Sequence, residues 1–198
     1  MEKEPYMIPA TTIKGTATGL LMMAVFTVIW AGIAYDGLHG TAYALLLVIF
    51  PLLGIYFIVK GGALFKIAKN FPKLTAEADI AEEKRRGKWF GIVFGAEGLG
   101  IFIGINVVVN LGHPELTIPV IALVVGLHFY PMGKIFKRTI DYYLATWSTL
   151  IAVCGIFFTL KKLMTANHIL AFLGVGLAIA TSCYGLYMAK RAKNCLSV

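Results

Sequence analysis

Charge is scarce in this sequence, and its scarcity excludes an ordinary soluble domain. Only 14% of the 198 residues are Asp, Glu, Lys or Arg, whereas 59% are hydrophobic. Soluble domains carry about 25% charged and about 45–50% apolar residues. A soluble fold of this length buries only about 70% of the surface that its unfolded chain exposes, which would leave a large apolar area in water. Lipid must therefore cover part of this chain.

The sequence also lacks the signatures of common enzymes and metal sites. It contains no G-x-S-x-G, H-E-x-x-H, P-loop or C-x-x-C motif. Its three cysteines, Cys154, Cys183 and Cys195, do not have the spacing of a zinc knuckle or of a disulfide framework. We therefore expect no cofactor and do not expect an enzyme, although an intramembrane hydrolase that uses Glu and His stays open as an alternative.

Ten-residue segments of alternating polar and apolar residues, which are typical of membrane β-barrels, are missing as well. Six long apolar stretches are present instead, each close to the length of about 20 residues that a membrane-spanning helix needs. They cover residues 15–35, 41–59, 89–111, 116–133, 142–160 and 169–189. The pattern predicts an all-α polytopic membrane bundle of six transmembrane helices, arranged as three hairpins within a single integral membrane domain.

Lysine and arginine gather in every second segment between these stretches. The segments before residue 15, at 60–88, at 134–141 and after 189 hold all 18 Lys and Arg residues except Lys161 and Lys162. Cytoplasmic loops of membrane proteins are the ones enriched in Lys and Arg. We therefore predict a multi-pass protein of the plasma or inner cell membrane, with both termini in the cytoplasm.

The longest polar segment is a basic cytoplasmic connector at 60–88. Its first part continues the second helix or lies along the lipid headgroups, and Pro72 ends it. The following residues predict a short helix, with Thr75 as its cap and acidic residues ahead of basic ones. This connector is either a solvated linker that fixes topology or a docking site for a partner or anionic lipid.

Glu97 is the one charged residue deep within an apolar stretch, where a carboxylate costs several kcal/mol unless it is protonated, paired or hydrated. His128 lies in the next stretch, about as far from the turn at His113 and Pro114 as Glu97 does. We therefore expect the two side chains at similar depth in one hairpin. They are either an acid–base pair that binds a proton or a cationic or polar ligand, or separate groups that each satisfy a neighbour.

Two local features favour an inward orientation of this pair. Gly100 and Gly104 follow Glu97 at the third and seventh positions, which allows another helix to approach that face closely. Pro131 deprives the Leu127 carbonyl of its usual hydrogen-bond donor, next to His128.

The inner halves of the last spans supply further candidate ligand- or proton-binding residues. Tyr130, Ser148, Ser182 and Tyr184 could outline a cytoplasm-facing pocket with Glu97 and His128. The alternative is ordinary hydrogen bonding between helices together with an aromatic belt. No residue is assigned a catalytic role.

Each outer loop contributes one histidine, namely His39, His113 and His168. Imidazole is a common zinc ligand, but no two of these residues stand three or four positions apart. We therefore expect no metal, with these three residues as the only candidates.

These observations favour a small transporter or ligand-binding membrane protein with a buried Glu/His site in its cytoplasmic half. The alternative is a non-catalytic structural or regulatory membrane subunit that acts through helix packing and its basic loop. The expected partners are the lipid bilayer, a small polar or cationic ligand or protons, and a second copy or another membrane subunit. Nucleic acid is not expected, because the basic residues follow topology.

Overall fold

The computed structural model describes residues 8–196, with side chains described through Lys193, so that the Cys195 side chain lies outside the described part. Six helices are long and apolar enough to cross a membrane. The helical segments are α1 (Ala10–Leu38), η1 (Ala42–Val48), α2 (Ile49–Ile67), η2 (Ala68–Asn70), α3 (Glu77–Asn110), η3 (Pro114–Leu116), α4 (Thr117–Phe136), α5 (Thr139–Leu160) and α6 (Ala166–Leu196). The prediction of an all-α bundle with six membrane-spanning helices is confirmed.

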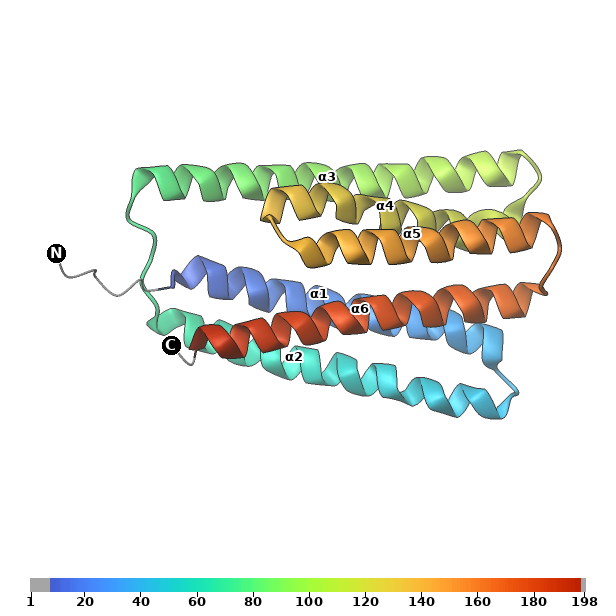
Figure 1. Ribbon diagram of the computed structural model, residues 1–198, viewed down its shortest axis with the longest axis horizontal. Helices are drawn as coiled ribbons and strands as arrows, with labels where there is room; N and C mark the ends of the chain where they lie inside the picture. The colour runs from blue at the N-terminus through green and yellow to red at the C-terminus, as the bar shows by residue number, and fades with distance from the viewer. Residues whose placement is uncertain (1–7, 197–198) are drawn as a thin grey trace.

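The helices form two groups of three. In Figure 1, α3, α4 and α5 lie together along one side, and α1, α2 and α6 along the other. All six run nearly along one axis, so the bundle has two ends. The start of α1, the end of α6 and the α4–α5 turn lie toward one end, here called the basic end. The turns after α1, α3 and α5 lie at the other, here called the short-loop end.

The connector at 60–88 is more helical than the sequence predicts. Helix α2 runs on through η2 to Asn70, and only residues 71–76 separate it from α3. The prediction of a separate short helix capped by Thr75 is wrong. Helix α3 begins at Glu77 after Ala76, without a side-chain cap, and continues without a break into the third span. The first turns of α3 therefore extend beyond the α4–α5 turn (Figure 1).

The second span begins with a 3₁₀ segment instead of an α-helix, and a proline lies just after the change. Pro51 has no N–H and cannot close the α-helical hydrogen bond to the Leu47 carbonyl. The chain upstream forms the 3₁₀ segment η1, and α2 begins at Ile49. The span as a whole is continuous from Ala42 to Asn70.

Small residues bring α1 and α6 into close contact. A Cβ at Gly174 would overlap the backbone of Trp30 and Ala34, and one at Gly37 would overlap the backbone of α6. Between these helices, the Thr27 hydroxyl donates to Thr181 Oγ1 at 2.9 Å, and both side chains are buried. Close packing and hydrogen bonds between helices are the main associating forces in lipid, so α1 and α6 form the best-packed pair of the bundle.

Candidate functional site

Glu97 and His128 lie side by side between α3 and α4. Glu97 Oε1 is 3.3 Å from His128 Nδ1, and only 6% and 9% of the two side chains are exposed. The predicted proximity of the pair is therefore confirmed. Its use in binding a ligand or a proton stays a prediction.

The glycines that follow Glu97 allow α4 to approach. A Cβ at Gly104 would lie 2.6 Å from Val120 Cγ1, and one at Gly100 would lie 3.2 Å from Val124 Cγ1. Only Glu97 and Val108 of α3 are buried. The carboxyl group therefore lies on the narrow face along which α3 touches α4, and most of the rest of α3 is exposed.

The contact between the two side chains is not a regular hydrogen bond. His128 Nδ1 is buried and has no hydrogen-bond partner among the described residues, although the carboxylate oxygen is 3.3 Å away. The imidazole packs against its neighbour Phe129, with ring centroids 4.1 Å apart. The ring nitrogen of a histidine donates or accepts a hydrogen bond according to its tautomer, so a small rotation of either side chain would complete a hydrogen bond between the two groups.

The other predicted site residues do not join this pair. The Tyr130 hydroxyl lies 3.2 Å from Thr146 Oγ1 of α5, at a partly exposed position. Ser148 is buried where Gly126 of α4 meets the backbone of α5. Ser182 is buried, and its hydroxyl has no hydrogen-bond partner among the described residues. It stands about 200° around α6 from Tyr184, so the two side chains face different neighbours.

Tyr184 belongs to a buried cluster that the sequence analysis does not predict. Its hydroxyl donates to Asp141 Oδ1 at 2.5 Å, and Arg138 Nε donates to Asp141 Oδ2 at 3.0 Å. Asp141 is fully buried. The apolar pattern predicts that the fifth span begins at residue 142, which places Asp141 in a loop. The signal was the three-residue spacing from Arg138, with the acid in the first turn of α5.

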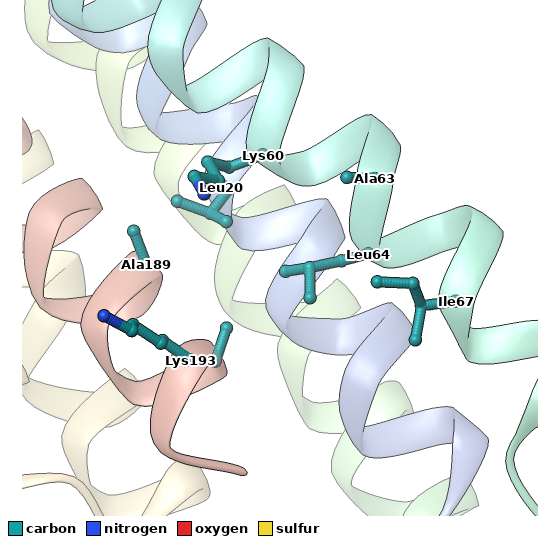
Figure 2. A pocket seen from close by; sticks show the side chains of 8 residues that line it. Leu20, Lys60, Ala63, Leu64, Ile67, Ala189 and Lys193 are labelled. Atoms are coloured by element: carbon teal, nitrogen blue, oxygen red, sulfur yellow. The ribbon is translucent and has the colours of Figure 1, made fainter. Parts of the chain in front are cut away.

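Two cavities open near the basic end, and neither is lined by Glu97 or His128. One, of about 300 Å³, lies between α1, α2 and α6 (Figure 2). The other, of about 340 Å³, lies where α5 begins beside α6. Its lining is formed by Lys137, Arg138, Thr139, Ile140, Tyr143, Tyr187 and Arg191.

The three outer histidines belong to three different hairpins: His39 and His113 lie in the turns after α1 and α3, and His168 lies in the first turn of α6. His39 Nδ1 contacts the Asp36 carbonyl, and His113 Nδ1 lies 3.0 Å from Glu115 Oε1, both at exposed positions. Within the part of the chain that the structure describes, no three His, Cys, Asp or Glu side chains are grouped so as to hold a metal ion.

Comparison with family models, with curated proteins and with solved structures finds no match for this chain. The class that its own structure defines is a multi-pass α-helical membrane protein with one buried Glu–His pair.

Proposed function

We propose that this chain is a small transporter-like or ligand-binding protein of the cell membrane in which the Glu97–His128 pair takes up a proton. The observation that carries this proposal is the 3.3 Å contact between Glu97 Oε1 and His128 Nδ1, with less than a tenth of either side chain exposed. An ionisable residue within a membrane span is costly, which favours a functional role for it.

A proton suits this pair better than a larger ligand does. The 3.3 Å between oxygen and nitrogen leaves no room for a larger group between them. With one shared proton the pair has no net charge, either as acid and imidazole or as carboxylate and imidazolium. Without that proton it carries a negative charge in apolar surroundings, which is unfavourable. A cationic substrate beside the carboxylate would displace the proton, and this exchange would couple proton and substrate movement.

The position of Glu97 on α3 supports a movement of this helix relative to α4. Of the most apolar 18-residue segment of α3 only 11% is buried, and α3 packs mainly against α4. A change of charge at Glu97 therefore acts on a helix that one neighbour holds. We expect the α3–α4 contact to loosen when the pair changes its protonation.

Infrared titration of the purified protein in lipid vesicles tests proton binding. Protonated Glu97 should give a carbonyl stretching band that Glu97→Gln removes, and His128→Gln should move the pH at which the band disappears. Glu115→Gln is the matched control, because Glu115 also contacts a histidine but is exposed. An unchanged titration in His128→Gln would show that the two residues do not share a proton.

Vesicles that contain a pH-sensitive dye test the transport part of the proposal. An applied membrane potential should drive proton uptake into vesicles with the wild-type protein. Glu97→Gln, which preserves the shape of the side chain, should abolish this uptake. Uptake above that of protein-free vesicles and equal in the two proteins would exclude a role for Glu97 in proton movement.

The orientation proposed for the chain places the basic end in the cytoplasm. Cysteines introduced at Lys73 and Lys193 should then be protected from an impermeant thiol reagent outside intact cells, whereas cysteines at the exposed positions His39 and Thr165 should react. The reason is the asymmetry of Lys and Arg between the two ends. Labelling of the Lys73 position from outside would contradict this orientation.

One observation favours the second candidate function, a non-catalytic subunit that acts through helix packing. Four glycines of α3 have no neighbour within 4 Å of the position that a Cβ would occupy, namely Gly87, Gly91, Gly95 and Gly98. Stripes of small residues allow helices to pack closely in membranes. Under this proposal α3 packs against another membrane helix along that face.

A further inference from the structure

The cavity between α1, α2 and α6 combines an apolar wall with two amines. Figure 2 shows Lys60 and Leu64 on α2 on one side of it and Ala189 and Lys193 on α6 on the other. Its other lining residues are aliphatic, and no acidic residue in the described part of the chain contributes to the lining. A volume of about 300 Å³ is at the lower end of the range, roughly 300–1,000 Å³, that ligand pockets occupy.

Small side chains keep this space open. Helices α2 and α6 meet where the Phe57 ring packs against Gly185. Toward the basic end the lining includes three alanines, Ala63 on α2 and Ala189 and Ala192 on α6. Their methyl groups are too short to close the gap. In a membrane, a lipid chain is the apolar group available to fill it.

The two amines have no acidic partner. Neither Lys60 nor Lys193 forms an ion pair with a described residue, and the Lys60 amine lies 5.8 Å from the centre of the Tyr56 ring. Helices α2 and α6 run in the same direction, and the Phe57–Gly185 contact sets their register. By the helical rise, Lys193 lies about 7.5 Å closer to the basic end than Lys60. Both amines can therefore reach a headgroup at that end by extending their side chains toward water.

We infer that this cavity binds one anionic phospholipid, with its phosphate between Lys60 and Lys193 and part of an acyl chain against Leu20 and Leu64. Basic sites between membrane helices are known to suit anionic headgroups. A free phosphate would gain nothing from the apolar wall. A zwitterionic lipid would bring a cation toward two lysines.

Native mass spectrometry with an equal mixture of phosphatidylglycerol and phosphatidylcholine tests this inference. The wild-type protein should retain one phosphatidylglycerol molecule in preference to phosphatidylcholine. The double variant Lys60→Gln/Lys193→Gln should lose that preference by roughly 25-fold, since one lysine near an anionic lipid contributes on the order of fivefold. Ala63→Phe, which fills the cavity without a change of charge, should weaken the binding of both lipids.

Lys84→Gln/Lys88→Gln is the matched control. It removes two positive charges from exposed positions of α3, outside the cavity, and should retain the preference. An equal loss in this control would show that net charge alone attracts the lipid, and retention in Lys60→Gln/Lys193→Gln would exclude the two amines. Displacement of the lipid by inorganic phosphate at equal concentration would show that the apolar wall plays no part. Any of these three results would overturn the inference.

Discussion

Helices α6 and α3 are both long and rich in glycine, yet they occupy opposite situations in the bundle. In the most apolar 18-residue segment of each helix, 67% of the residues are buried in α6 and 11% in α3. Neighbouring groups occupy the space beside the glycines of α6: α1 packs against Gly174, Ile151 against Gly176 and Phe57 against Gly185. On α3 only Gly100 and Gly104 meet a neighbour. The same residue type therefore holds one helix in place and leaves most of the other unpartnered.

The polar groups of the two helices differ in the same way. On α6, Thr181 bonds to Thr27 and to the Leu177 carbonyl of its own helix, and Tyr184 bonds to Asp141. On α3, the buried Glu97 has one close polar neighbour, His128, at a distance and alignment short of a hydrogen bond. Polar groups that are fully bonded stabilise a helix in place. Ser182 of α6 also lacks a hydrogen-bond partner among the described residues, but its hydroxyl is not an acid or a base near neutral pH. We therefore propose a function for α3, which carries the ionisable Glu97, and a structural role for α6.

The largest effect is expected from Gly174→Leu in α6. Because a Cβ there would overlap the backbone of α1, which cannot move aside as a side chain can, the variant should lose about 3 kcal/mol or more of stability. Thermal unfolding in detergent measures this loss. A variant as stable as the wild type would show that the close approach of α1 and α6 is not required.

A smaller loss is expected from Tyr184→Phe, which removes one donor from the fully buried Asp141. Hydrogen bonds to charged groups contribute about 1.5–3 kcal/mol, so the midpoint of unfolding should fall accordingly. Tyr130→Phe is the control, because its hydroxyl bonds to Thr146 at a partly exposed position, and we expect a loss of under about 1 kcal/mol. Equal losses in the two variants would contradict the special position of Tyr184.

The Glu97–His128 contact should give a coupling of about 1 kcal/mol in a double-mutant cycle of Glu97→Gln and His128→Gln, since residues in contact couple by roughly 0.5–3 kcal/mol. The readout is stability in detergent at several pH values. The exposed Glu115–His113 pair, at 3.0 Å, provides the matched cycle and should couple by under about 0.5 kcal/mol. Additive effects at the buried pair would show that Glu97 and His128 are not energetically coupled and would remove the support for shared proton binding.

The smallest effect on stability is expected from Gly95→Leu in α3, within about 0.5 kcal/mol, because no atom lies within 4 Å of its Cβ position. The same variant tests the second candidate function through energy transfer between labelled copies in vesicles. A loss of energy transfer without a loss of stability would favour packing of α3 against another copy. A large loss of stability would show that this face is already occupied within one chain.

Local rules predicted the spans and one contact of the candidate site correctly. The length of the apolar stretches and the fixed rise of a helix are enough to place six spans, and Glu97 and His128 stand about equally far from the turn that joins α3 to α4. Local rules do not predict the Arg138–Asp141–Tyr184 cluster, because its burial depends on α6. Tyr184 of that helix is 43 residues from Asp141 in the sequence. The expected gathering of Ser182 with Tyr184 did not allow for their separation around α6.

The sequence by itself determined that this chain is a six-helix membrane bundle, since apolar length and the lack of charge leave no other place for these segments than lipid. It also predicted that Glu97 and His128 lie at similar depth, because a hairpin aligns residues at equal distance from its turn, whereas the structure shows that the two side chains face each other. Only the tertiary structure decided that α1 packs on α6 and that α3 is held mainly by α4. Glycines occur on both α3 and α6, and a stripe of glycines allows another helix to pack closely without specifying which helix that is. The arrangement of all six helices therefore decides that neighbours pack against the glycines of α6 and leave most of those on α3 uncovered.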